Sequence, residues 1–163
     1  MYSVFIGYII ELDQRTAVAK IETGNNNVRL SEEMFDFWQL IEFYMESVPD
    51  DDFALWDELK QKGVLACAET IDELYECIKN LYPIRQGVIY KSDENAHIVL
   101  GDIPIEIVKL QSYIWQGADG KRNLSDILIK ASNNERLNEV EPVRDFVENV
   151  VGLVRAGALV LKN

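Results

Sequence analysis

The chain has 163 residues, of which 48% are hydrophobic, and this is enough to fill one core or two small ones. Its formal net charge of -12 lies mostly in residues 1–90, which hold 7 basic and 17 acidic side chains. Because nucleic-acid affinity comes largely from basic groups, this half argues against nucleic-acid binding, although a solubilising acidic surface explains the same charge. Without a long apolar run or a signal-peptide pattern, the sequence predicts a cytoplasmic protein with no membrane partner.

The first thirty residues predict strands. Residues 2–13 are rich in Tyr, Val, Phe and Ile, and residues 16–23 alternate apolar and polar after a polar turn at 13–15. A "GNNN" turn at 24–27 precedes a third apolar segment. We expect a three-stranded antiparallel meander.

Helices follow. Ser31 is placed to cap a first helix whose apolar stripe extends to Met45. The acidic run "VPDDD" at 48–52 ends that helix and supplies aspartates to cap a second helix at 53–62, which stops at Gly63.

A third helix at 70–81 has the clearest start, because Thr70 and Glu73 have the spacing of a capping box. Cys77 falls on its apolar stripe, and with Cys67 ten positions away there is no C-x-x-C pair. Buried thiols are therefore expected, not a disulfide or metal site.

The second half begins with a predicted hairpin of residues 88–92 and 97–101, followed by a helix from about 103 to 116. A turn at 119–120 leads to a short helix capped by Asn123 or Ser125. Pro142 fits the first position of a long last helix, and a final strand follows at 158–162.

The two halves show a short internal similarity. "RQGVIY" at 85–90 matches "RAGALV" at 155–160, so that Gly87 aligns with Gly157, and the same offset places 28–32 on 98–102. The predicted fold class is α+β, with two tandem winged-helix-like units that each combine a small antiparallel sheet with three helices. The expected units are residues 1–86 and residues 87–163.

The second half also resembles the PqqD-like family over about residues 97–161. The matching positions are an Asp-Gly turn, an acidic-Ile pair and a closing Gly-aliphatic strand: Asp119, Gly120, Asp126, Ile127, Gly157 and Leu159. Asn123 replaces the usual threonine cap, and the first half has no Asp-Gly turn. The resemblance implies small winged helices that bind the leader peptides of peptide-modifying enzymes, the peptide adding as a strand beside the third helix.

Groups for catalysis are few. The single histidine, His97, has no cysteine nearby, and no phosphate-binding glycine loop is present. The aspartates at 50–52 do not alternate as calcium-loop ligands do, so capping explains them better than a cation. The sequence predicts no enzyme activity, no cofactor and no metal site.

The three tryptophans have different expected roles. Trp38 lies on an apolar helical stripe and is expected in the core. For Trp56 and Trp115 we expect partial burial between the two copies, with contact to a partner as the alternative.

The favoured hypothesis is a non-catalytic adaptor that binds a protein or peptide. Its groove is expected between a strand and the helix at 70–81, whose acids favour a basic partner, although ordinary surface acids explain them too. The strand residues are Asn27, Val28, Arg29 and Leu30, and the acids are Asp72, Glu73 and Glu76.

Two alternatives stay open. A DNA-binding regulator would use the second unit, with Lys121, Arg122 and Arg144 near its last helix, but acidic residues flank that helix. The hydrophobic N-terminal strand could instead pair with another chain in a homodimer or larger assembly.

Overall fold

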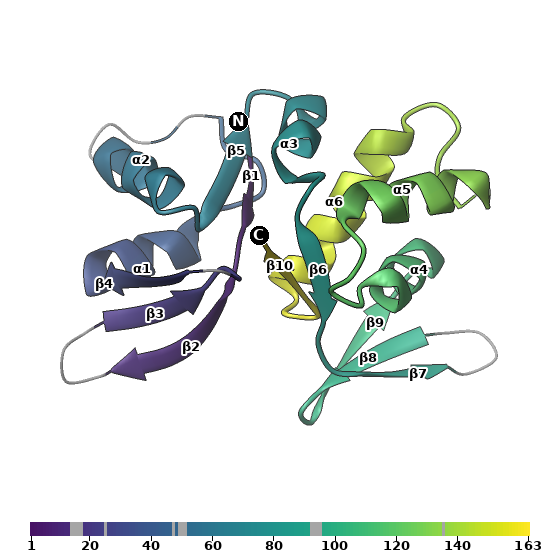
Figure 1. The fold of residues 1–163 in the computed structure, drawn as a ribbon, viewed down its shortest axis with the longest axis horizontal. Helices are drawn as coiled ribbons and strands as arrows, with labels where there is room; N and C mark the ends of the chain where they lie inside the picture. Colours follow the sequence, from purple (N-terminus) through teal and green to yellow (C-terminus); the bar gives the residue numbers. More distant parts are fainter. Residues whose placement is uncertain (14–17, 25, 47, 49–51, 92–95, 135) are drawn as a thin grey trace. The chain divides into compact units, whose positions relative to one another are not determined.

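The structure is a computed structural model that describes every residue except 14–17, 25, 47, 49–51, 92–95 and 135 (Figure 1). The chain is a mixed α+β protein with small antiparallel sheets, as the sequence predicts. It divides into two compact units, Met1–Cys77 with Leu161–Asn163, and Ile78–Val160, where the sequence suggested a division after residue 86. Most of the expected turn at 13–15, the aspartates at 50–51 and the connection at 92–95 within the predicted hairpin lie outside the described residues.

The first unit alternates short strands and helices. In chain order its elements are β1 (Tyr2–Phe5), β2 (Tyr8–Asp13), β3 (Val18–Glu22), β4 (Asn27–Ser31), α1 (Glu32–Leu40), α2 (Phe53–Gln61), β5 (Leu65–Ala68) and α3 (Ile71–Ile78). The expected meander is present as the sheet β2-β3-β4. The segment 2–13 is two strands instead of one, because Gly7 turns the chain with a φ of 92° and β1 pairs with β5.

Helix α1 begins as expected and ends early. The Ser31 hydroxyl accepts a hydrogen bond from the Met34 amide at 3.3 Å. The helix stops at Leu40 because the next backbone groups bond to β1: Ser3 N donates to Phe43 O at 2.8 Å, and Met45 N donates to Met1 O at 2.9 Å. Tertiary pairing outweighs the helical periodicity that continues to Met45.

A cluster of apolar side chains from β3, β4, α1, α2 and β5 forms the core of the first unit. Trp38 lies in it, as expected, and donates its indole N–H to Val64 O at 3.3 Å. Trp56 is only 1% exposed and packs edge-on against Phe37.

Helix α3 starts with the predicted capping box. Glu73 N donates to Thr70 Oγ1 at 3.2 Å, and Thr70 N donates to Glu73 Oε2 at 3.2 Å. The prediction of a buried Cys77 is wrong, since this thiol is exposed and the buried stripe runs through Ile71, Leu74 and Ile78 instead. Cys67 is half-buried, and burial raises the pKa of its thiol.

The second unit has a sheet of three strands followed by three helices. Its elements are β6 (Tyr82–Arg85), β7 (Val88–Lys91), β8 (Ala96–Leu100), β9 (Ile103–Ile107), α4 (Lys109–Gly117), α5 (Leu124–Asn133), α6 (Pro142–Arg155) and β10 (Leu159–Lys162), whose last two residues count with the first unit. Helix α6 packs against α4 and α5, and Pro142 takes its first position as predicted. Asn123 caps α5 by accepting from Asp126 N at 2.9 Å.

Residues 103–107 form a strand, where the sequence suggested a helix from 103 to 116. Gly101 turns the chain with a φ of 59°, and Ile105 then pairs with the fully buried Ile98. Within β9, Ile105 and Ile107 are half-buried and buried while Pro104 and Glu106 are exposed, which is the periodicity of a strand. The helix begins only at Lys109.

The two units repeat one order of elements, in which a strand leads into a meander, a helix follows, and a later helix ends in a strand that returns to the first. Gly7 and Gly87 lie between the first strand and the meander, with φ angles of 92° and 80°. Gly63 and Gly157 precede the returning strand, with φ angles of 70° and 74°. Gly87 and Gly157, which the sequence comparison aligned, therefore lie at different places in this order, since Gly87 follows β6 and Gly157 follows α6.

Candidate functional site

The strand expected to bind a peptide is an edge strand. β4 is hydrogen-bonded to β3 alone within its sheet, with a continuous register from Asn27 to Ser31. Asn27 and Arg29 are exposed, Val28 is half-buried and Leu30 is fully buried. The side chains of Asn27 and Arg29 are therefore accessible to a partner and that of Leu30 is not, and one edge of β4 has no strand partner in its sheet.

The acidic helix expected beside this strand does not pack along it. The helix that packs against β4 is α1, because β5 takes the chain back to β1 before α3 begins. Asp72, Glu73 and Glu76 are exposed on α3, and Glu73 is also used in the capping box. The structure therefore does not bring the two sides of the predicted groove together.

Of the other three edges of the two three-stranded sheets, β7 has a continuous register over four residues, while β2 and β9 are less regular than β4. In β2 the register shifts between Ile9 and Glu11, which marks a bulge. β9 contains Pro104, which has no backbone N–H to donate. Both features hinder the addition of a further strand.

The N-terminal strand is not a free edge. β1 pairs with β5 on one side, and a bridge between Tyr2 and Tyr44 covers the other. A second chain would have to displace one of these neighbours to pair with β1.

Two of the residues proposed to contact DNA are held in ion pairs. Arg122 Nη2 lies 2.8 Å from Asp119 Oδ2, and Arg144 Nε lies 2.9 Å from Glu148 Oε1. The Arg122 side chain and the amides that follow Asp119 hold the pKa of this carboxyl well below its usual range. Lys121 is exposed on this loop beside the exposed Asp119. Because Arg122 and Arg144 are each paired with a carboxylate, these three cations do not form an uninterrupted basic surface.

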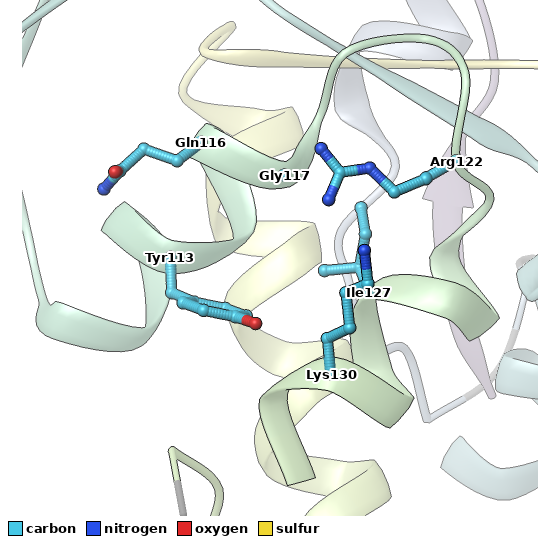
Figure 2. A pocket seen from close by; sticks show the side chains of 6 residues that line it. All are labelled: Tyr113, Gln116, Gly117, Arg122, Ile127 and Lys130. Carbon is cyan, nitrogen blue, oxygen red and sulfur yellow. The ribbon is translucent and has the colours of Figure 1, made fainter. Parts of the chain in front are cut away.

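The second unit also has a surface pocket formed by two of its helices. A surface pocket of about 170 Å³ lies between α4 and α5 of the second unit (Figure 2), and its lining residues are Tyr113, Gln116, Gly117, Arg122, Ile127 and Lys130. A neighbouring hollow of about 270 Å³ shares Arg122 and Lys130 and adds Asp126 and Ile129. No pattern in the sequence indicated this pocket, because its residues come from two helices and the turn between them.

The C-terminal strand closes a polar network on the first unit. Tyr8 OH donates to Glu22 Oε2 at 2.7 Å, and Lys162 Nζ donates to Glu22 Oε1 at 2.7 Å. The hydrogen bond from Lys162, and next that from Tyr8, lowers the pKa of Glu22, while the bond to Glu22 raises the pKa values of Tyr8 and Lys162. These contacts fasten Lys162 to β2 and β3.

The tryptophans are not exposed for a partner. Trp56 and Trp115 are 1% and 5% exposed, which is deeper than the partial burial expected from the sequence. Trp115 donates its indole N–H to Gln86 O at 2.9 Å and lies beneath the Arg85 guanidinium. Both rings belong to the cores of their own units.

The described residues contain no group of three or more His, Cys, Asp or Glu side chains placed to hold a metal ion. His97 is half-buried in the middle strand β8, where its cross-strand neighbours are Tyr90 and Glu106. In the part of the chain with described coordinates, no helix is long and apolar enough to cross a membrane.

Comparison with protein-family models gives no match, and comparisons with curated proteins and with solved structures likewise give none.

Proposed function

We propose that this protein is a non-catalytic module that binds an extended segment of a peptide or protein by strand addition at the outer edge of β4. One observation carries the proposal: β4 is a regular five-residue edge strand without a proline or a bulge. Unpaired N–H and C=O groups on such an edge are a template for another strand. The bulge in β2 and Pro104 in β9 make those edges poorer templates.

The side chains beside this edge favour an acidic segment. Arg29 is exposed on β4, and its cross-strand neighbour is Lys20 on β3. Opposite charges on adjacent strands stabilise their pairing, so an Asp or Glu of the incoming strand opposite Arg29 strengthens binding. This replaces the basic partner suggested by α3, whose acids do not lie along β4.

We further propose that the two units are diverged copies of a winged-helix-type module, as the PqqD-like resemblance implies for the second half. The common order of elements and the paired glycines Gly7 and Gly87 support this view. Peptide binding through a sheet edge is then a property of the module. β4 is the longer of the two edge strands, β4 and β7, that contain neither a bulge nor a proline.

Peptide selection tests the proposal. A displayed library of random decapeptides is selected on the whole protein, and the expected binders share alternating side chains with an acid at one position. Hydrogen exchange followed by NMR should show new protection at β4 amides in the bound state and none at β9.

The matched variants are Arg29→Glu and Arg155→Glu, which change charge equally at two exposed arginines on different units. Arg29→Glu should weaken binding of the selected peptides about fivefold, because repulsion replaces an exposed ion pair. Arg155→Glu should leave their affinity unchanged. Equal effects of both variants, or protection that appears away from β4, would overturn the assignment.

The DNA-binding alternative has less support, because Arg122 and Arg144 are already paired with carboxylates. A duplex that binds at low ionic strength with a steep salt dependence, and binds less well to Lys121→Gln, would favour this alternative instead.

A further inference from the structure

We propose that the pocket between α4 and α5 binds a monocarboxylate group, supplied either by a small organic acid or by an acidic side chain of a partner. The pocket lies in the second unit, so this proposal is independent of the β4 edge. It rests on the convergence of two cations and a tyrosine hydroxyl around an apolar floor (Figure 2).

Lys130 supplies the main charge of the pocket. Among the described residues no carboxylate lies within ion-pair distance of its ammonium group, whereas Arg122 is paired with Asp119. The ammonium is therefore available to an incoming anion. An ion pair with a carboxylate is the interaction that such a group most readily forms at a surface.

Arg122 and Tyr113 supply directed donors. The hydrogen bonds that Arg122 makes to Asp119 use its Nε and Nη2 groups, which leaves the Nη1 group, and Figure 2 shows the guanidinium directed toward Gly117. The Tyr113 hydroxyl accepts from Asn134 Nδ2 at 3.3 Å, so its own proton remains to be donated. Arg136 lies over the Tyr113 ring at 5.8 Å and adds positive charge at the rim.

The floor of the pocket is apolar. Gly117 has no side chain, and Ile127 lies beneath it, so a Cβ at Gly117 would lie 3.4 Å from Ile127 Cγ1. Gln116 points away from Arg122, and its amide nitrogen donates to Ser112. A short alkyl chain attached to the carboxylate can therefore rest on Gly117 and Ile127.

Charge balance favours a monoanion over phosphate. Asp119 neutralises Arg122, which leaves Lys130 as the main unbalanced charge, and Asp126 lines the neighbouring hollow. A carboxylate matches that single charge, while a phosphate dianion would keep an unpaired negative charge beside Asp126. On a chain with a net charge of -12, such a local cationic pocket is selective for anions that also fit its shape.

The first experiment is an NMR titration of the full chain with sodium propionate at constant ionic strength. We expect saturable shifts of the Gly117, Ile127 and Lys130 amides, with a dissociation constant of about 1 to 10 mM for so small a ligand. Lys130→Gln should weaken binding about fivefold. The control Lys121→Gln removes an equal charge from an exposed lysine of the preceding turn, outside the pocket, and should change the affinity less than twofold.

Tyr113→Phe keeps the ring and should weaken propionate binding about threefold, because the hydroxyl donor is lost. Two further probes separate the sources of the carboxylate: an N-acetylated pentapeptide amide with one central glutamate among alanines, and its glutamine counterpart. Propionate binding alone assigns a free acid, and binding of the glutamate peptide but not the glutamine peptide assigns a partner's side chain. Tighter binding of inorganic phosphate than of propionate, equal effects of the two lysine variants, or non-saturable shifts would each overturn the proposal.

Discussion

Gly7 and Gly87 occupy the same place in the two units. Each has a positive φ, 92° and 80° respectively, and a Cβ at either position would lie 2.6 Å from a backbone carbonyl oxygen of the adjacent sheet strand, Glu22 O or Val99 O. A side chain is excluded twice, by the backbone conformation and by the close approach of the neighbouring strand. The two glycines allow the first strand of each unit to leave the meander and pair elsewhere.

Gly7→Ala and Gly87→Ala should each cost at least about 2 kcal/mol of folding free energy, because the strained φ and the backbone clash add. Gly63→Ala is the matched control, since Gly63 also has a positive φ but nothing lies within 4 Å of the added Cβ. We expect about 1 kcal/mol there. Urea unfolding followed by circular dichroism measures the three values. Equal losses at Gly7 and Gly63 would show that close packing contributes nothing.

Glu22 should make the stability of the first unit depend on pH. The bonds from Lys162 and Tyr8 lower its pKa in the folded state, so its contribution is present above the unfolded-state value, ordinarily about 4.3, and is lost as pH falls through the folded value. Glu22→Gln should therefore lower the unfolding midpoint at pH 7, and the difference from the wild type should shrink in strong acid.

The control for this prediction is Glu106→Gln, which neutralises an exposed carboxylate on β9. It should leave the midpoint at pH 7 nearly unchanged. If the loss in Glu22→Gln is the same at pH 7 and below pH 3, the ionised carboxylate is not what stabilises this network.

Asn123 should contribute to stability as a helix cap. Its side-chain oxygen accepts from Asp126 N at 2.9 Å, so Asn123→Ala leaves an amide of the first turn of α5 without that partner and should cost about 1 kcal/mol. Asn123→Asp should retain most of the stability. Asn133→Ala, at the other end of α5, should cost little, since alanine favours the helix. Thermal unfolding of the three variants provides the comparison.

Trp115 should stabilise the second unit through its indole N–H as well as its ring. Trp115→Phe leaves the Gln86 carbonyl without its donor and creates space beside the Arg85 guanidinium, for an expected loss of about 2 kcal/mol. Tyr113→Phe, on the same helix but half-buried, should cost less than 1 kcal/mol. A fluorescence-monitored urea titration is suitable for Tyr113→Phe, and circular dichroism for Trp115→Phe.

Features that depend on neighbouring residues could be predicted from the sequence. The caps at Ser31 and Asn123, the capping box of Thr70 and Glu73, and the start of α6 at Pro142 are all present, because each needs only groups within one helical turn. The meander β2-β3-β4 is present because its strands are consecutive and alternate apolar with polar residues.

Features that depend on distant partners were decided by the tertiary structure. Helix α1 ends at Leu40 because residues 43–45 bond to β1, and residues 103–107 are a strand because Ile105 meets Ile98. The matching places of Gly7 and Gly87 in the two units become visible only with the pairings β1-β5 and β6-β10, which join segments far apart in the chain. The candidate sites likewise combine local features with features that depend on distant partners. The sequence indicated a strand at residues 27–30, whereas the helix beside it and the Lys130 pocket depend on long-range packing that local periodicity does not encode.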